Sequence, residues 1–315
     1  MRQKIILWIE DYLFYPNSFQ RLLSFFLLPL TLIYILIITF KKIGVKKIDF
    51  SLPIISIGNL IVGGSGKTPF VLELAKDKEN VAVILRGYGR NSKGLYIVSH
   101  RGDIKVDINI SGDEAMLLAN SLPKASIIVA ENRKEAILKA KTLGCSLIFL
   151  DDGFSKYDIK KFDILLKPKL EPENIFCLPS GGYREPKMMY ASADIVLQEG
   201  IDFERMVTYK LNNDVLSSLP LKLVLLTAIS KPKRLLDFLP SYTILEAYAD
   251  HHTFKKEEID ELLLKYKGYS FITTSKDLVK LEQFAIKDIY LMSLELRILK
   301  SMDKMDEYIR NYYKN

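Results

Sequence analysis

A glycine-rich segment follows a short apolar run near residue 60 and restricts the fold around it. The run is PIISI at residues 53–57, and the segment reads Gly63-Gly64-Ser65-Gly66-Lys67-Thr68. Residues 69–76 (PFVLELAK) have a helical composition, so the order strand, loop, helix is predicted. Glycine lets backbone N–H groups turn inward around phosphate oxygens, and a helix N-terminus adds its positive dipole end. The segment therefore predicts a phosphate-binding loop after a buried strand.

This loop departs from the usual P-loop pattern at one position. The pattern G-x-x-x-x-G-K-[ST] asks for glycine at position 61, where this chain has isoleucine, so Gly63 and Gly64 must make the turn. In such loops the lysine reaches the β- and γ-phosphates and the hydroxyl binds Mg²⁺. A structural glycine-rich turn is the alternative, which the Gly-Lys-Thr ending disfavours. The predicted site for ATP phosphates is Ile61, Val62, Gly63, Gly64, Ser65, Gly66, Lys67 and Thr68.

Short β-branched runs alternate with helical stretches in the middle of the chain. Strands are expected at residues 53–57, 81–85, 126–130, 146–150, 162–166 and 194–197, and helices at 113–121 and 133–142. Because the runs are almost continuously hydrophobic, both faces of each strand should be buried, as in a parallel sheet covered by helices. The predicted fold class is α/β, with a doubly wound parallel sheet.

The strand pattern restarts after residue 200, with apolar runs at residues 222–227, 242–246 and 270–274. This favours a second, smaller α/β unit. We expect an N-terminal membrane-associating segment at 1–45, a P-loop core at 46–205 and a C-terminal domain at 206–315 that closes over the cleft. The C-terminal helix could belong to the core instead.

An uncharged apolar run of 19 residues lies at positions 22–40. About 20 apolar residues span a bilayer as a helix, so this run is a marginal transmembrane segment, with Pro29 as a kink. The lysines that follow place the rest of the chain in the cytoplasm. A mixed stretch upstream is typical of an interfacial amphipathic helix, with the aromatic residues Trp8, Tyr12, Phe14 and Tyr15. Three interpretations of the apolar run stay open: a helix that spans the membrane, a helix at its interface and a buried core helix.

The net charge indicates which partners the chain can bind, and the counts of cysteine and histidine exclude some kinds of site. The 45 basic and 38 acidic residues give a net charge of +7, which favours anionic partners such as phosphates or a membrane surface. Because the sequence has no zinc-finger spacing, RNA-recognition signature or dense basic tract, no nucleic-acid partner is expected. The two cysteines and three histidines exclude a disulfide scaffold and a metal site rich in either residue.

Two acidic pairs follow or begin predicted elements. Asp151 and Asp152 end the strand at 146–150, and in P-loop enzymes a carboxylate at such a strand tip holds Mg²⁺. Acidic residues also close strands without that role, but next to a P-loop the pair predicts a metal site together with Thr68. Asp113 and Glu114 come at a predicted helix start, where the helix dipole alone favours them.

Glycine-rich turns that present arginine follow two strand ends, Arg86-Gly87-Tyr88-Gly89-Arg90 and Gly181-Gly182-Tyr183-Arg184-Glu185-Pro186. Such turns suit phosphate or anionic-substrate contacts, although solvated loops share these residues. Asp250-His251-His252 follows the strand at 242–246. Paired histidines are usually structural, while a carboxylate beside them would suit acid–base work.

Taken in order, these motifs resemble those of the tetraacyldisaccharide 4'-kinases of lipid A assembly. The matching segments are GNLIVGGSGKTP (58–69), LRGYGR (85–90), GDE (112–114), LDDGF (150–154), LPSGGYREP (178–186), DHHTF (250–254) and TTSKDLVKL (273–281). Two departures matter. Ala115 stands where the family usually has proline, which alters helix entry, and Ser155-Lys156 replaces Gln-His, which removes a possible contact of that loop.

The resemblance implies ATP- and Mg²⁺-dependent phosphorylation of the 4'-hydroxyl of a tetraacylated glucosamine disaccharide 1-phosphate. It places a monomeric enzyme at the cytoplasmic face of the bacterial inner membrane. It also implies that Asp113 is the base, with His251 supporting it and Lys67 stabilising the transferring phosphoryl group. The expected substrate contacts are Asn59, Arg86, Glu114, Arg184 and Glu185.

Two other functions stay open. P-loop ATPases that couple hydrolysis to partitioning or metal delivery have similar loops, but they usually carry lysine before Gly-Gly, where this chain has Val62. A membrane-bound nucleotide-binding module without catalysis is the other alternative. Lipid-stimulated ATP turnover would separate a kinase from both.

Overall fold

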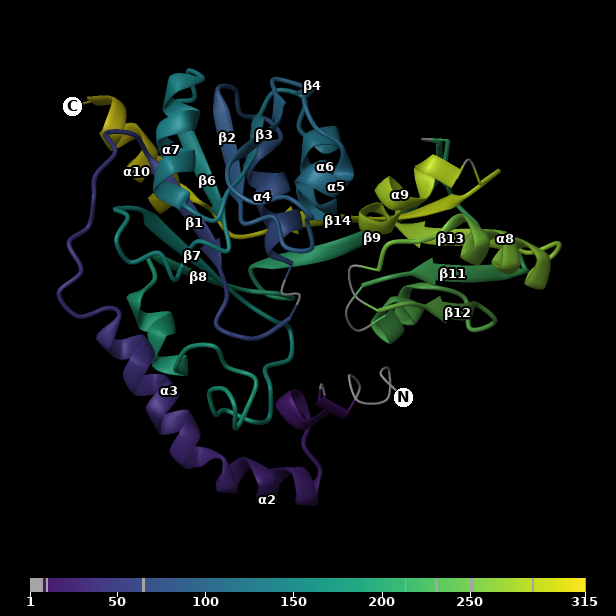
Figure 1. Ribbon diagram of the computed structural model, residues 1–315, viewed down its shortest axis with the longest axis horizontal. Coiled ribbons are helices and arrows are strands. Elements are labelled where there is room, and N and C mark those ends of the chain that lie inside the picture. The colour runs from purple at the N-terminus through teal and green to yellow at the C-terminus, as the bar shows by residue number, and fades with distance from the viewer. Residues whose placement is uncertain are drawn as a thin grey trace. The chain divides into compact units, whose positions relative to one another are not determined.

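The computed structural model describes residues 8–9, 11–63, 66–212, 214–229, 232–249, 252–284 and 286–314, with only the backbone at position 234. The chain forms two compact units (Figure 1). The first comprises Met1–Val71, Ile137–Glu204 and Ile298–Asn315, and the second comprises Leu72–Ala136 and Arg205–Arg297. The predicted domain boundaries after residues 45 and 205 stay a prediction.

The first unit is built on parallel strands in the order β6-β1-β7-β8. Their bounds are β1 (Ile54–Gly58), β6 (Leu147–Asp151), β7 (Phe162–Lys167) and β8 (Ile195–Gln198). Every residue of β1 and β6 is buried, as continuous apolar strands in a covered sheet should be. Because Ile57 pairs with Asp151, the loop after β1 and the acidic end of β6 come to the same edge.

Helices of the first unit surround these strands. They are α2 (Ser18–Phe26), α3 (Leu28–Phe40), α10 (Asp303–Lys314) and the 3₁₀ helix η1 (Lys187–Ser192). Two further helices, α4 (Lys67–Ala75) and α7 (Arg133–Thr142), contribute residues to both units. The sequence places α4 two residues later, but Pro69 is tolerated in the first turn of a helix, so the helix begins at Lys67.

The apolar run at 22–40 is divided between α2 and α3, which meet at a bend of 57°. Pro29 lies in the first turn of α3, so the predicted kink is confirmed. Residues 11–14 are helical. Tyr12 and Phe14 are buried in a cluster with other apolar residues, whereas Trp8 and Tyr15 are 43% and 52% exposed, so the interfacial amphipathic helix stays a prediction.

The second unit contains two sets of strands. The first set has the order β4-β3-β5-β2, with β2 and β5 parallel and β3 antiparallel to both of its neighbours. The bounds of its elements are β2 (Val81–Leu85), β3 (Tyr96–His100), β4 (Asp103–Ile104), α5 (Ile108–Ser111), α6 (Asp113–Ser121) and β5 (Ser126–Val129).

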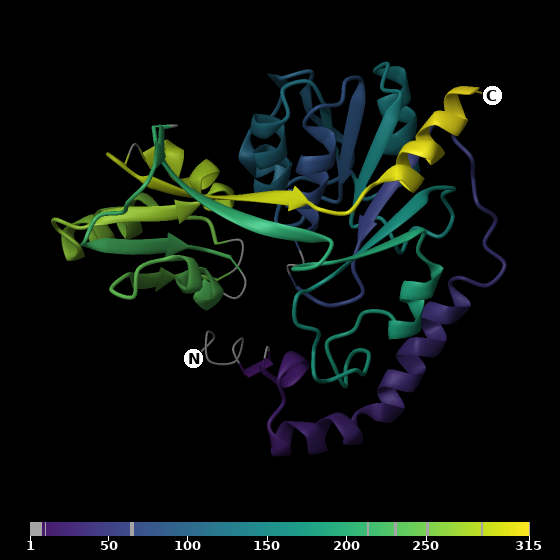
Figure 2. The ribbon, with the colours of Figure 1, turned by 180° about the vertical axis from the view of Figure 1, so that it is seen from behind.

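The other set is a six-stranded sheet of order β10-β9-β14-β13-β11-β12, in which β9 and β14 run side by side (Figures 1 and 2). Its strands are β9 (Phe203–Leu211), β10 (Asp214–Leu216), β11 (Leu223–Thr227), β12 (Ile244–Ala247), β13 (Ser270–Thr274) and β14 (Tyr290–Ile298). Its helices are η2 (Pro232–Phe238), α8 (Lys256–Lys265), α9 (Ser275–Leu281) and η3 (Glu282–Phe284). The α/β prediction with parallel strands is confirmed. The strands predicted at 81–85 and 270–274 match β2 and β13, and the other predicted strands differ from the observed ones by one or two residues at their ends.

Candidate functional site

The predicted phosphate loop connects β1 to α4. Gly63 and Gly66 have φ values of 92° and 78°, a left-handed conformation that glycine adopts without strain. Lys67 is the first residue of α4 and Thr68 the second, so both side chains start at a helix N-terminus. Gly64 and Ser65 lie outside the described residues.

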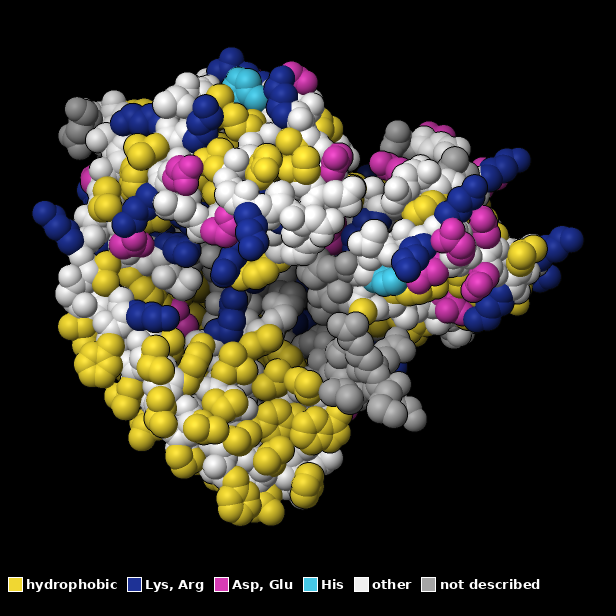
Figure 3. Space-filling view, in the orientation of Figure 1, with side chains coloured by type: hydrophobic (Ala, Val, Ile, Leu, Met, Phe, Trp, Pro, Cys, Tyr) yellow, Lys and Arg dark blue, Asp and Glu magenta, His cyan; other side chains and the backbone are white. Residues whose placement is uncertain are grey.

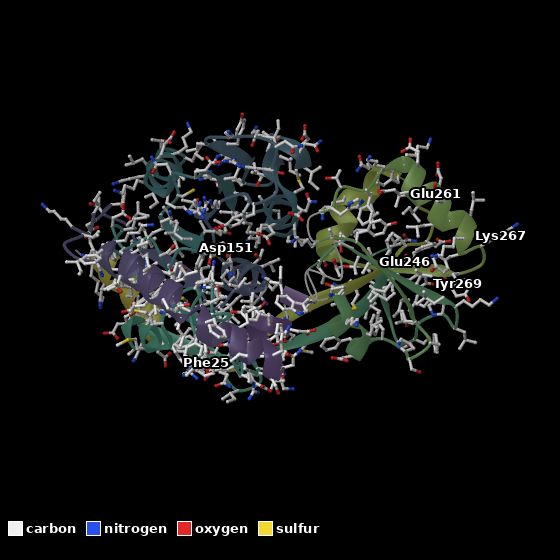
Figure 4. The ribbon with its side chains drawn as sticks, turned by 60° about the horizontal axis from the view of Figure 1, so that its bottom comes forward. Phe25, Asp151, Glu246, Glu261, Lys267 and Tyr269 are labelled. Carbon is white, nitrogen blue, oxygen red and sulfur yellow. The ribbon has the colours of Figure 1, made fainter. Side chains whose placement is uncertain are left out.

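A hydroxyl–carboxylate contact connects this loop to β6. Thr68 Oγ1 donates a hydrogen bond of 2.8 Å to Asp151 Oδ2. Asp151 is the last residue of β6 (Figure 4) and is only 5% exposed. A buried carboxylate and a hydroxyl side by side at the end of a parallel sheet form the kind of oxygen-donor set that Mg²⁺ prefers.

The second carboxylate, Asp152, lies among cationic and amide groups. Both terminal nitrogens of the Arg184 guanidinium contact this carboxylate, with Nη1 at 3.1 Å from Oδ2 and Nη2 at 3.0 Å from Oδ1. Lys67 Nζ is 3.7 Å from Asp152 Oδ1 and donates to Asn59 Oδ1 over 3.1 Å. Arg184 Nη2 also donates to that amide oxygen. The structure thus joins Asn59, Lys67, Asp152 and Arg184 in one network beside the Thr68–Asp151 pair.

The LPSGGYREP segment supports this network through its backbone. Arg184 N donates to Leu60 O over 2.7 Å, and Val62 N donates to Gly182 O over 2.8 Å, so the segment pairs with the entry to the phosphate loop. On its other side Tyr34 of α3 donates from its hydroxyl to Arg184 O over 2.7 Å. Helix α3 therefore holds the residue whose side chain contacts Asp152.

Glu185, a predicted substrate contact, has partners within the protein. Lys42 Nζ lies 2.6 Å from its Oε2, and Tyr157 donates a hydrogen bond to its Oε1. Burial and then the nearby Glu185 carboxylate raise the pKa of Tyr157 well above its usual value, so this phenol stays a donor. Lys42 and Tyr157 were not expected here. The position of Lys42 directly after the apolar run is the one sequence signal that favours an anionic neighbour.

Asp113 and Glu114 lie in the second unit, at the start of α6. Gly112 precedes them with φ 81°, and a Cβ there would approach Tyr88 O to 3.1 Å. Asp113 is 5% exposed, and its Oδ2 lies 3.1 Å from Lys280 Nζ and 3.6 Å from Lys276 Nζ. Both lysines belong to the TTSKDLVKL segment, in which sequence reasoning assigned no role. Lys276 and Lys280 are four residues apart, which places both on one face of a helix, and this spacing is the signal that could have indicated a shared partner.

Arg86 and His251 are the remaining residues that the sequence predicted for the site. Arg86 follows β2 in the second unit and donates to the Tyr88 hydroxyl over 3.3 Å. Asp250 and His251 lie outside the described residues. The adjacent His252 contacts Glu258 Oε2 at 2.9 Å through Nε2. Within the described part of the chain, no group of three or more His, Cys, Asp or Glu residues is placed to hold a metal ion. Mg²⁺ in phosphoryl-transfer sites commonly uses one or two carboxylates plus phosphates, so the Thr68–Asp151 pair fits it.

The comparisons with known proteins identify the family of the chain. The sequence model of the family described as LpxK, tetraacyldisaccharide-1-P 4'-kinase, matches residues 23–314. The chain belongs to this family. It is 62% identical over 314 residues to a tetraacyldisaccharide 4'-kinase of Aliarcobacter butzleri, covering 99% of this chain and 100% of the relative. It is 45% identical over 308 residues to the tetraacyldisaccharide 4'-kinase of Helicobacter acinonychis, covering 97% of this chain and 96% of the relative.

A solved LpxK structure is similar along most of the chain. The crystal structure of an "apo" form of LpxK from Aquifex aeolicus in complex with ATP matches with a TM-score of 0.73 and 28% identity. The match covers 92% of this chain and 99% of that one. The predicted fold class, family and assignment as a sugar-hydroxyl kinase are confirmed, and the kinase is favoured over the two other functions.

Proposed function

We propose that this chain transfers the γ-phosphoryl group of ATP, with Mg²⁺, to the 4'-hydroxyl of a tetraacyldisaccharide 1-phosphate. The observation that carries this proposal is the contact between Thr68 at the start of α4 and Asp151 at the end of β6, with Lys67 beside it. Membership of the tetraacyldisaccharide-1-P 4'-kinase family supports the acceptor, and the ATP complex of the Aquifex relative supports the donor.

Each residue at this edge has a role that follows from its chemistry. Lys67 supplies a positive charge to the β- and γ-phosphates, and the loop residues 61–66 supply backbone N–H groups. Thr68 and Asp151 would hold Mg²⁺ through their oxygens, with Asp152 close by. When bound, Mg²⁺ neutralises charge on the phosphate oxygens. Arg184 keeps Asp152 and Asn59 in place, which leaves Lys67 directed into the loop.

Asp113 is proposed as the base for the acceptor hydroxyl. It is a buried carboxylate at a helix start of the second unit, whereas the proposed metal ligands Thr68 and Asp151 belong to the first, so it is assigned the role of base and not of ligand. The O–H bond of the acceptor breaks, its proton passes to Asp113, and the oxygen bonds to the γ-phosphorus as ADP leaves. His251 is proposed to support this carboxylate, as the family resemblance implies. Arg86, Glu114 and Glu185 are proposed to contact the substrate.

The N-terminal helices are proposed to bind the cytoplasmic face of the bacterial inner membrane. Figure 3 shows hydrophobic side chains gathered over α2 and α3. Among the residues described, no helix alone has the length and apolar composition to cross a membrane, although α2 and α3 taken together do. The exposed apolar side chains of these helices are Phe19, Leu22, Phe25, Phe26, Leu30, Leu32, Ile33, Leu36, Ile37 and Phe40. A lipid-bearing substrate would be presented at such a surface.

One experiment tests the activity. Purified full-length protein is incubated with ATP, Mg²⁺ and disaccharide 1-phosphate lipid in micelles, and the lipid is analysed by mass spectrometry. A product heavier by one phosphate, absent without lipid and strongly reduced in Asp113→Asn, is expected. ATP hydrolysis that does not depend on the lipid and yields no phosphorylated lipid would instead favour an ATPase. An Asp113→Asn enzyme with full turnover would remove Asp113 as the base.

A further inference from the structure

The carboxylate of Asp113 is fixed by two different groups of the second unit. Its Oδ1 accepts a hydrogen bond of 3.0 Å from the backbone N of Glu114, and its Oδ2 lies 3.1 Å from Lys280 Nζ. Lys276 Nζ is more distant, at 3.6 Å from Asp113 Oδ2 and 3.6 Å from Glu114 Oε1. Helix α9 carries both lysines and lies against α6.

Lys280 is buried, with 7% of its surface exposed. An ammonium group taken out of water is costly unless it is paired with carboxylates or donates compensating hydrogen bonds. Its Nζ has a second carboxylate at 3.4 Å, Oδ1 of Asp277, three residues earlier on the same helix. Lys280 therefore lies between Asp277 and Asp113, and its position is set from both sides.

Asp277 is itself immobilised. Its side chain is fully buried, and its Oδ2 accepts hydrogen bonds from Thr227 Oγ1 (2.7 Å), Ala228 N (3.0 Å) and Thr274 Oγ1 (3.0 Å). Thr227 ends β11, and Thr274 caps α9. The sheet thus fixes Asp277, and Asp277 fixes Lys280. Lys280 in turn contacts Oδ2 of Asp113, while the backbone N–H of Glu114 contacts Oδ1.

We propose that Lys280, anchored by Asp277, is a positioning residue that holds the Asp113 carboxylate in one orientation for the acceptor hydroxyl. This inference rests on the proposed role of Asp113 as the base. A neighbouring ammonium weakens a carboxylate as a base. The arrangement therefore suits a carboxylate that orients the hydroxyl and takes its proton late, which agrees with the loose transition state of phosphoryl transfer.

A set of variants of the full-length protein separates positioning from simple stabilisation. Lys280→Met keeps the length of the side chain and removes its charge, and Lys280→Arg keeps the charge. Thr273→Val is the matched control, because the hydroxyl of this buried residue of β13 donates to Leu226 O over 2.8 Å, outside the contacts that lead from Thr227 to Asp113. For each variant, kcat, KM for ATP and Tm are measured with the disaccharide lipid.

Lys280→Met is expected to lower kcat by about 10- to 100-fold, a part of the 10²- to 10⁴-fold that a general base contributes, with KM for ATP changed less than about twofold. Lys280→Arg should recover part of kcat. Thr273→Val should lower Tm but keep kcat within about twofold. If Lys280→Met does not fold, Lys280→Gln, which can hydrogen-bond to both carboxylates, is judged by the same fall in kcat.

A double-mutant cycle completes the test. If Lys280 acts through Asp113, Asp113→Asn/Lys280→Met has the residual turnover of Asp113→Asn within about twofold. Strictly multiplied losses would overturn the proposal, as would an unchanged kcat in Lys280→Met or an equal loss in Thr273→Val. An active Asp113→Asn enzyme would instead overturn the base assignment, so the two failures are distinguishable.

Discussion

The guanidinium of Arg184 forms a bidentate ion pair with the carboxylate of Asp152, with Nη2 at 3.0 Å from Oδ1 and Nη1 at 3.1 Å from Oδ2. The same guanidinium contacts the Asn59 side chain, which accepts a hydrogen bond from Lys67. The lysine of the phosphate loop is thus oriented by a residue more than a hundred positions later in the chain. The LPSGGYREP segment thus contacts the proposed phosphate site, and the sequence suggested a contact with either phosphate or an anionic substrate.

Arg184→Lys should impair the kinase, although the substitution keeps the positive charge. Lysine is a point charge and cannot reproduce two parallel hydrogen bonds to one carboxylate together with a contact to Asn59. We expect kcat/KM for ATP to fall by about 10-fold or more with Tm nearly unchanged, since the pair is partly exposed. Steady-state kinetics and thermal melting measure both quantities. Unchanged kinetics would show that Asp152 and Asn59 need no arginine.

Lys67→Ala should reduce turnover more than any other change in the loop. It removes a charge that stabilises the transferring phosphoryl group, and single groups of that kind contribute about 10²- to 10³-fold in kcat. Thr68→Val should raise the Mg²⁺ concentration needed for half-maximal rate, because one oxygen donor is lost beside Asp151. Mg²⁺ titrations of both variants against Thr142→Val, a distant exposed threonine, provide the measurement and its control. Near-normal turnover in Lys67→Ala would contradict the P-loop assignment.

The sequence predicted those parts of the site that depend on local rules. Strand β1, the loop and α4 follow from an apolar run, glycines and a helix start, and the helix bounds 113–121 and 133–142 match α6 and α7. It did not predict contacts made by tertiary packing. Lys42 follows an apolar run, and Lys276 and Lys280 are four residues apart. These patterns do not indicate that Lys42 and Tyr157 reach Glu185, or that Lys280 is buried against Asp113. Such contacts depend on which faces of distant elements meet.

The apolar face of α2 and α3 should determine membrane binding. Phe19, Phe26 and Leu32 are 69%, 73% and 60% exposed, so replacing all three with Gln should leave the core intact. We expect most of the co-sedimentation with anionic phospholipid vesicles to be lost at unchanged Tm, because each apolar side chain contributes about 1.5–3 kcal/mol when buried. Leu264→Gln is the matched control, since Leu264 is 78% exposed on α8. Undiminished sedimentation of the triple variant would rule out this surface as the anchor.

The thiol of Cys177 should report whether the N-terminal helices are docked. Cys177 is 3% exposed within a cluster that includes Tyr12, Leu13 and Phe14, and Thr31 of α3 donates a hydrogen bond to its carbonyl oxygen over 3.3 Å. Burial raises the pKa of this thiol to about 11, so at pH 8 only about 0.1% would be the reactive thiolate even if the reagent had access.

A Cys145→Ala background leaves Cys177 as the single thiol. In the native protein at pH 8 we expect no reaction with a disulfide reagent on a timescale of minutes, and complete reaction in denaturant. Raising the pH through 11 increases the thiolate fraction but not access, so labelling should stay limited by opening of α3. Thr31→Val should accelerate labelling, because it removes the hydrogen bonds of Thr31 to Cys177 and Ser180 and opening then costs less free energy. Rapid labelling of the native parent protein would mean that α3 does not cover Cys177, and the helix could then not hold Arg184 through Tyr34.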